Sequence, residues 1–225
     1  MPWTHIGPPI DVRPLFPVER AELLALLETL DEAAWHAPTV CPGWDVHDLA
    51  AHVVHDYLRR LSGGRDGWSA GWIPVPDTVS WALPDTPAPV WLDVAREYTE
   101  FWVHQQQIRA AVGRPGADSR KLMYPVIDAF LRALPRTLAD AGGSSVTLWV
   151  TAPIDEAWTA RRGPDGWLLR RGEEASPDVR LELAPETLWQ VATRGIEPAE
   201  ALERTTVDGD AELAAATLSL VSIVR

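Results

Sequence analysis

Cysteine and basic residues are both scarce in this sequence. Cys41 is the only cysteine among 225 residues, which excludes an internal disulfide bond and a cysteine-rich zinc site. Lys and Arg number 20 against 32 Asp and Glu, giving a net charge of −12. Because nucleic-acid phosphates and anionic membrane surfaces attract clustered positive charge, this balance argues against both kinds of partner.

Long apolar runs are also missing. No run approaches the ~20 residues needed to span a bilayer, and the first residues, MPWTHIGPPIDVRP, lack the apolar centre of a signal peptide. Hydrophobic residues make up 46% and charged residues 23% of the chain, an ordinary balance for a globular protein. We therefore expect a soluble, cytoplasmic protein, as a monomer or a homodimer. Any metal site in it must use His and carboxylate ligands.

The first half of the chain has the spacing of apolar residues that is typical of amphipathic helices. We predict four helices, over residues 17–30, 45–61, 90–112 and 119–141. Pro125 and Pro135 should kink or segment the last helix, because proline lacks the N–H group that a helix interior needs. Residues 64–89 form a long loop with three tryptophans, which we expect to pack over another part of the protein.

The pattern changes near Gly142 and Gly143. Alternating apolar residues predict strands over residues 145–151, 156–162, 166–171 and 179–183, with a hairpin turn at 163–165. A helix over 185–193, a turn at 207–210 and a terminal helix over 211–225 should follow, the last burying Leu213, Leu218 and Val221 against the sheet. The sequence thus predicts an α+β protein, with a four-helix domain at 1–142 and a small α+β domain at 143–225.

Three residues in the helical half are candidate metal ligands. Glu100 and His104 lie four residues apart on one predicted helix and so share a face, as ligands of one ion do. His52 lies on another predicted helix, and all three lie to one side of the apolar stripes of their helices. The alternative for Glu100 and His104 is an exposed pair that adds little stability. The spacing alone leaves both interpretations open.

Other residues are weaker candidates, each with a structural alternative. His55 is a substitute ligand or proton shuttle, or else a solvated histidine; Arg109 binds a substrate carboxylate, or else forms a surface salt bridge. Trp72 and Trp81 in the long loop line a cofactor or substrate pocket, or else pack in the core. Cys41 is a reactive thiol or soft ligand, or else a small buried side chain.

Two motifs resemble a known family. The run CPGWDVHDLAAH, at 41–52, resembles the CPGW-x-V-x-D-x-x-AH signature of mycothiol-dependent maleylpyruvate isomerase-like proteins, which belong to the DinB-like superfamily of metal-binding four-helix bundles. The run EFWVHQQQIR, at 100–109, is similar to their E-x-W-x-H-x-x-x-I-R helix. The tail, with PETLW at 185–189 and VDGD at 207–210, resembles the family's C-terminal domain, which is similar to sterol carrier proteins.

The resemblance implies a site and a chemistry. The family's ligands fall on His52, Glu100 and His104, which would hold a divalent metal, zinc first and nickel as the alternative, with one position left for water or substrate. Many relatives carry Asp where this chain has Gln107, which puts a carboxylate role at that position in doubt. In the family, an actinobacterial thiol, mycothiol, adds to a conjugated double bond and leaves after cis–trans rotation.

Two functions therefore remain open at the level of the sequence. In the first, the protein is a metal-dependent enzyme that uses a low-molecular-weight thiol such as mycothiol for isomerisation or transfer on a small electrophilic substrate. In the second, the metal-bearing bundle binds or senses a small molecule without turnover. An open coordination position favours the enzyme, and a fourth protein ligand favours the binding module.

Overall fold

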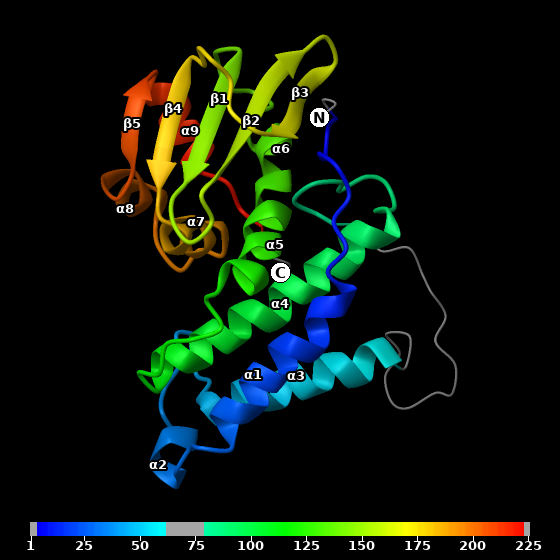
Figure 1. The fold of residues 1–225 in the computed structure, drawn as a ribbon, viewed down its shortest axis with the longest axis vertical. Helices are drawn as coiled ribbons and strands as arrows, with labels where there is room; N and C mark the ends of the chain where they lie inside the picture. Colours follow the sequence, from blue (N-terminus) through cyan, green and yellow to red (C-terminus); the bar gives the residue numbers. More distant parts are fainter. Residues whose placement is uncertain (1–3, 62–78, 223–225) are drawn as a thin grey trace.

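The computed structural model describes residues 4–61 and 79–222. Helices make up the N-terminal part and lie below a five-stranded sheet, with α4 and α5 leading from one part to the other (Figure 1). The α+β class predicted from the sequence is therefore confirmed. None of the helices within the described residues combines the length and apolar character needed to cross a bilayer.

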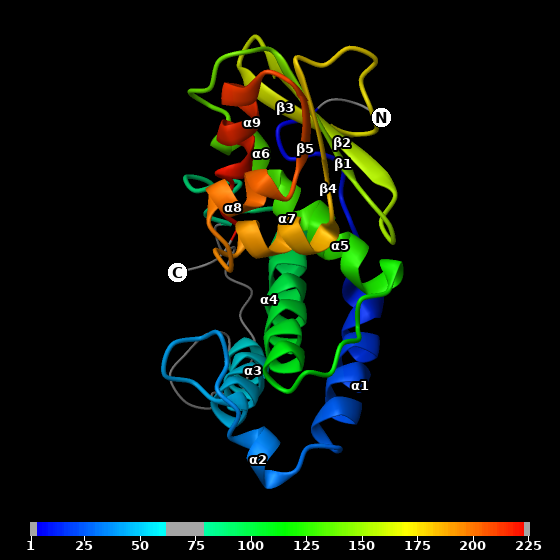
Figure 2. The ribbon, with the colours of Figure 1, turned by 90° about the vertical axis from the view of Figure 1, so that its left-hand side faces the viewer.

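Four longer helices form the N-terminal bundle. α4 contacts α1, α3 and α5 and is the central helix of the group (Figure 2). The predicted fourth helix is broken, because a 3-10 turn follows α5 and a short helix, α6, begins at Leu134 with Pro135 in its first turn. The long helices are α1 (Phe16–Leu27), α3 (Val46–Leu61), α4 (Val90–Ala111) and α5 (Arg120–Phe130). The short ones are η1 (Arg13–Leu15), α2 (Glu32–Trp35), η2 (Leu131–Ala133) and α6 (Leu134–Thr137).

A capping interaction fixes the start of α3. The Asp48 backbone N–H donates to Asp45 Oδ1 over 2.9 Å, and the Asp45 N–H donates to Asp48 Oδ2 over 3.3 Å. Such reciprocal capping satisfies N–H groups that have no partner inside the helix. Val46, Leu49 and Val53 follow on the buried face of α3 and pack against α1 and α4. This packing holds α3 beside α4 and thereby sets where His52 lies.

The C-terminal part is a mixed sheet in the order β3-β2-β1-β4-β5. Its strands are β1 (Ser145–Val150), β2 (Glu156–Gly163), β3 (Gly166–Arg171), β4 (Val179–Leu183) and β5 (Thr206–Gly209). Only the β1–β4 pair is parallel among these neighbours. α6 and α9 (Ala211–Leu218) contact the sheet, and α7 (Pro185–Ala192) packs against α5 (Figure 2).

The sequence prediction was wrong at three places in this part. Residues 206–209 form the edge strand β5 rather than a turn, because they pair with β4. A short helix, α8 (Pro198–Glu203), was not predicted. The terminal helix ends at Leu218, so Val221 lies beyond it and is only partly buried, whereas Leu213 and Leu218 are buried as expected.

One apolar core runs from α4 and α5 into the sheet, and a second cluster of buried side chains joins α1, α3 and α4. One cluster of buried side chains joins Leu92 and Trp102 of α4 and Ile127 of α5 to Leu148 of β1 and Leu181 of β4. The N-terminal segment also reaches the sheet, where the Thr4 N–H donates to the Leu169 carbonyl over 3.3 Å. A division of the chain at residue 143 stays a prediction, and any such boundary lies inside one continuous core.

Candidate metal centre

The three predicted ligands lie together where α3 packs against α4. His52 projects from α3, and Glu100 and His104 project from α4. One ligand atom of each residue lies within 4.8 Å of the ligand atoms of the other two. The imidazole rings of His52 and His104 meet edge to face, with centroids 4.9 Å apart. The helix packing thus gathers two imidazoles and one carboxylate at one point.

His104 is fixed by contacts at both of its ring nitrogens. Nδ1 lies 2.8 Å from Gln107 Oε1, and Nε2 lies 3.4 Å from Glu100 Oε1. Because an amide oxygen only accepts, Nδ1 carries a proton, and in the neutral ring the lone pair is then on Nε2. Nε2 is buried and has no hydrogen-bond partner among the described residues. A buried nitrogen lone pair that faces a carboxylate is suited to a cation.

Without a bound ion, Glu100 and His104 each stabilise the charged form of the other. Burial would raise the pKa of Glu100, but the neighbouring His104 and His52 outweigh burial and lower it. Burial would likewise lower the pKa of His104, whereas Glu100, Gln107 and the more distant Asp56 raise it. Glu100 is therefore held in its charged form, which is the form that binds metal.

His52 has neighbours of its own on two sides. Its Nε2 lies 3.4 Å from Asp56 Oδ2, one turn further along α3. The Trp44 ring lies edge to face with the His52 ring, 5.1 Å between centroids. Trp44 is 40% exposed, so it lies at the surface of the protein beside the His52 ring.

The donor set fits a divalent ion. Around a tetrahedral zinc ion with ligand distances of about 2.0–2.1 Å, neighbouring ligand atoms lie about 3.4 Å apart. His104 Nε2 and Glu100 Oε1 are separated by 3.4 Å, which matches this value. Two neutral imidazoles and a carboxylate are also the ligands that zinc and nickel accept.

Asp56 and the contacts of Gln107 were missed in the sequence. Asp56 is buried although it is charged, and it lies four residues after His52, the same spacing as Glu100 and His104. This spacing places Asp56 on the same helix face as His52, so it could have identified Asp56 from the sequence. Gln107 Oε1 accepts from His104 and also from the Cys41 thiol over 3.5 Å, so the amide oxygen is the acceptor at the position where the sequence put a carboxylate role in doubt.

Arg109 lies away from the ligands. Its guanidinium donates to the Glu22 carbonyl over 3.2 Å and to the Arg114 carbonyl over 3.5 Å, and it lies 3.5 Å from the Glu22 carboxylate. These contacts tie α4 to α1 and to the segment after α4. Arg109 is buried by them, so they account for it without a substrate carboxylate.

The remaining candidates differ in their surroundings. Trp81 is buried in the main apolar core, so packing accounts for it, and Trp72 lies outside the described residues. His55 is exposed, and it groups with His52 and Asp56 rather than with Glu100 and His104. Partial burial raises the pKa of the Cys41 thiol, against a hydrogen bond from Thr39, so Cys41 is not an activated thiolate.

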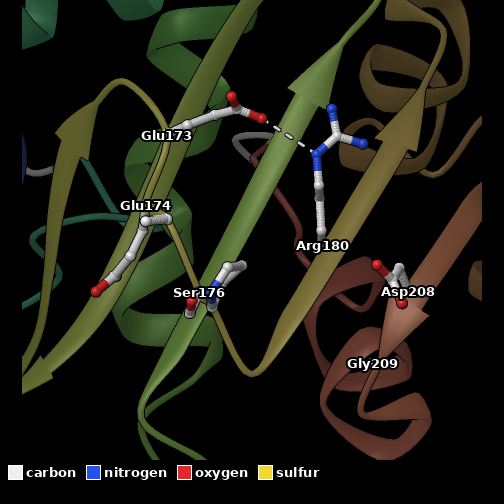
Figure 3. A pocket seen from close by; sticks show the side chains of 8 residues that line it. Glu173, Glu174, Ser176, Arg180, Asp208 and Gly209 are labelled. Atoms are coloured by element: carbon white, nitrogen blue, oxygen red, sulfur yellow. Dashed lines mark hydrogen bonds and ion pairs between the residues drawn. The ribbon is translucent and has the colours of Figure 1, made fainter.

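A polar cavity lies at the far end of the molecule from α3. It has a volume of about 650 Å³ and lies over the outer face of β4 and β5 (Figure 3). Arg180 projects beside it and is paired with Glu173 at 3.1 Å and with Glu182 at 2.9 Å. Arg180 is the one cation among the residues that line the cavity, and these two carboxylates neutralise it. The cavity therefore lacks the features of an anion site.

The geometry defines a helical bundle with a cluster of two histidines and a glutamate between two of its helices. Residues 16–168, more than half of the chain, match the family described as "Mycothiol maleylpyruvate isomerase N-terminal domain", and the chain belongs to that family. The match extends past residue 143 into β3. No curated protein matches the chain.

The solved structures that the chain matches include two of distant likeness. Sterol carrier protein 2 like 2 from Aedes aegypti is 17% identical, with a TM-score of 0.35 over 45% of this chain and 98% of that chain. The inverting sec-alkylsulfatase Pisa1 from Pseudomonas sp. is 17% identical, with a TM-score of 0.35 over 96% of this chain. This chain spans 34% of the sulfatase.

Proposed function

We propose that the protein binds a divalent metal ion, zinc first and nickel as the alternative, through His52, Glu100 and His104. We further propose that it is an enzyme that uses a low-molecular-weight thiol such as mycothiol for isomerisation or transfer on a small electrophilic substrate. The observation that carries the metal proposal is the buried His104 Nε2, which has no hydrogen-bond partner among the described residues and faces Glu100 and His52.

Each residue would have a separate task. Gln107 holds the proton of His104 on Nδ1 and so keeps Nε2 available. The lowered pKa of Glu100 keeps its carboxylate charged. A bound divalent ion would lower the pKa of a thiol and stabilise the thiolate beside the substrate. The edge of Trp44 next to His52 would exclude water from that side of the site.

The family supports the thiol and the class of reaction, and the substrate remains to be found by assay. If the protein only binds or senses its ligand, mycothiol should bind without any turnover of an unsaturated or otherwise electrophilic acid. Turnover that depends on both the metal and mycothiol would establish the enzyme.

Metal content tests the ligand assignment. The wild-type protein and the variants His52→Ala, His104→Ala and His47→Ala would be loaded with zinc, dialysed and analysed for metal by mass spectrometry. His47 lies on α3 as well but is exposed, so it is the matched control. We expect about one zinc per wild-type and control chain, and loss of most zinc from the other two variants. Full retention by either variant would refute the assignment.

Thermal stability tests the thiol. Addition of mycothiol should raise the melting temperature of the zinc-loaded wild-type protein, because a ligand that binds only the folded state stabilises it. The His104→Ala variant should show no such shift. A shift of equal size in that variant would mean that the thiol binds elsewhere.

A further inference from the structure

The contact between α1 and α4 contains buried polar atoms without partners among the described residues. Both carboxylate oxygens of Glu19 on α1 have no hydrogen-bond partner there, and the same is true of Gln105 Oε1 and Arg109 Nε on α4. The three residues are 1%, 0% and 7% exposed. Because a buried polar group without a partner is costly, we expect these atoms to find partners in some state of the protein.

Two contacts and one charge effect place these residues at the same interface. Gln105 Nε2 donates to the backbone carbonyl of Glu19 over 3.4 Å, so the Gln105 amide lies beside Glu19. Arg109 is held to α1 as well, since its Nη2 donates to the Glu22 carbonyl over 3.2 Å. The positive charge of Arg109 lowers the pKa of the Glu19 carboxyl, although burial outweighs it. The two helices thus bring together a carboxyl group, an amide oxygen and a guanidinium N–H.

The unpartnered atoms on α4 suit the two protonation states of Glu19 in turn. A protonated carboxyl has one O–H donor, and Gln105 Oε1 is an acceptor for it. An ionised carboxylate only accepts, and Arg109 Nε is a positively charged N–H donor. Gln105 Oε1 can serve only the protonated state, whereas Arg109 serves the ionised state best.

We infer that Glu19 is a pH-dependent switch at the contact between α1 and α4. When Glu19 is protonated, it donates to Gln105 Oε1; when it is ionised, its side chain turns and accepts from Arg109 Nε. The proton is released to solvent, and side-chain rotation is sufficient for the change. Glu19 lies outside the groups of candidate metal ligands, so the inference does not depend on the proposed function.

Arg109 is the buried cation at this contact. Among the described residues, the other ionisable groups that act on the Glu19 carboxyl or pair with Arg109 are Arg20 and Glu22 of α1, Tyr57 of α3 and Tyr98 of α4. Arg20 is exposed, whereas Arg109 is buried. From η1, which also packs against α1, Arg13 pairs with Asp11 at 2.8 Å.

The two tyrosines stay neutral over the range in which Glu19 changes its charge. Burial, with Glu19 as the second cause, raises the pKa of Tyr57 to about 12 and also raises the pKa of Tyr98. The Tyr98 hydroxyl donates to the Leu122 carbonyl over 3.0 Å. Tyr57 is therefore the neutral donor that competes with Arg109, and the second test below includes it.

NMR of the arginine side chains is the direct test. The Nε–Hε signal of Arg109 would be assigned by its absence in Arg109→Lys and followed in the wild-type protein without added metal. Between about pH 5 and about pH 9 it should shift with a midpoint near the folded pKa of Glu19, about 7. Glu19→Gln should abolish the shift, and Glu22→Gln should keep it. Glu22 is the matched control, because its carboxylate also lies 3.5 Å from Arg109.

A signal of Arg109 that does not shift over this range would overturn the inference. A shift that persists in Glu19→Gln would do the same, because another group would then be its source.

The partner of the protonated form is tested by Gln105→Met, which keeps a similar shape and lacks the amide oxygen. Loss of this acceptor destabilises protonated Glu19, so the midpoint should fall by up to about one pH unit. Tyr57→Phe should leave the midpoint unchanged. An unchanged midpoint in Gln105→Met, or a raised midpoint in Tyr57→Phe, would assign a partner elsewhere and overturn the inference. Neither result would bear on the metal ligands.

Discussion

Two of the charged clusters among the described residues differ in how far the protein itself satisfies their polar atoms. At the interface of α5 and the sheet, Asp128 accepts from Trp158 Nε1 and from the Nε and Nη2 of Arg171, each over 2.8 Å, and from Arg132. At the α3–α4 contact, His104 Nε2 has no hydrogen-bond partner among the described residues. The polar atoms of Asp128 all have partners, whereas the α3–α4 cluster keeps one buried nitrogen without a hydrogen-bond partner among the described residues.

The comparison shows how a buried polar group can be assigned to the fold or to a site. Burial alone would raise the pKa of Asp128, but Arg171, Arg132 and Trp158 outweigh it and lower the pKa. The protein therefore supplies everything that the Asp128 charge needs, and the result is a link between the bundle and the sheet. The His104 lone pair has no such partner among the described residues, and we therefore assign it to a bound ion.

The largest effect on stability should come from a substitution of Asp128, whose cluster the protein satisfies fully. Asp128→Ala leaves Arg132 buried without its carboxylate and should lower the free energy of unfolding by about 3–5 kcal/mol. Urea unfolding followed by fluorescence would measure this, with Asp118→Ala as an exposed control. The folded fraction should keep its zinc. A loss below about 1 kcal/mol would mean that the cluster does not hold the two parts together.

Glu19 of α1 is a third kind of buried group. It lacks the hydrogen-bond partners that Asp128 has, and it does not lie among the candidate metal ligands. Its carboxylate is 1% exposed, and its oxygens have no hydrogen-bond partner among the described residues. Burial raises the pKa of Glu19 to about 7, against the opposing charges of Arg109 and Arg20. The unfolded chain then loses this proton at a lower pH than the folded protein does.

Stability should therefore fall as the pH rises from the unfolded pKa of Glu19, 4.5, to the folded value of about 7. The shift corresponds to roughly 3 kcal/mol. Glu19→Gln cannot ionise, so it should be more stable than the wild-type protein at about pH 8 and lose most of this slope. Unfolding curves at several pH values would measure both. An unchanged slope in Glu19→Gln would assign the pH dependence to other groups.

A smaller effect should come from the residue that orients His104. Gln107→Leu removes the acceptor of the His104 Nδ1–H group and should weaken zinc binding by about tenfold, with little change in unfolding. Gln106→Leu is the matched control, because Gln106 donates to the Gly116 carbonyl on another side of α4. Equal zinc affinity in the two variants would show that Gln107 does not orient the ligand.

The helices and most strands could be predicted because their patterns are local. Apolar spacing gave α3 and α4 nearly to the residue, and the His52 and Glu100–His104 motifs follow from those helices. β5 was missed because the residues 206–209 form a strand only through pairing with β4, which is a long-range contact. Its own sequence, TVDG, reads as a turn.

The details of the site depend on how helices pack, which the sequence does not reveal. Helical spacing placed Arg109 one turn from His104, but only the packing of α1 against α4 shows that Glu22 engages it. The spacing of Asp56 from His52 is visible in the sequence, but the burial of its carboxylate is not. Trp81, in an irregular segment, has no period from which its burial follows.

Anomalous diffraction at the zinc absorption edge would test the central claim most directly. Crystals of the zinc-loaded protein should show one strong anomalous peak between α3 and α4, about 2.0–2.1 Å from nitrogen atoms of His52 and His104 and from a carboxylate oxygen of Glu100. No peak at these three residues, or a single peak elsewhere on the chain, would contradict the account.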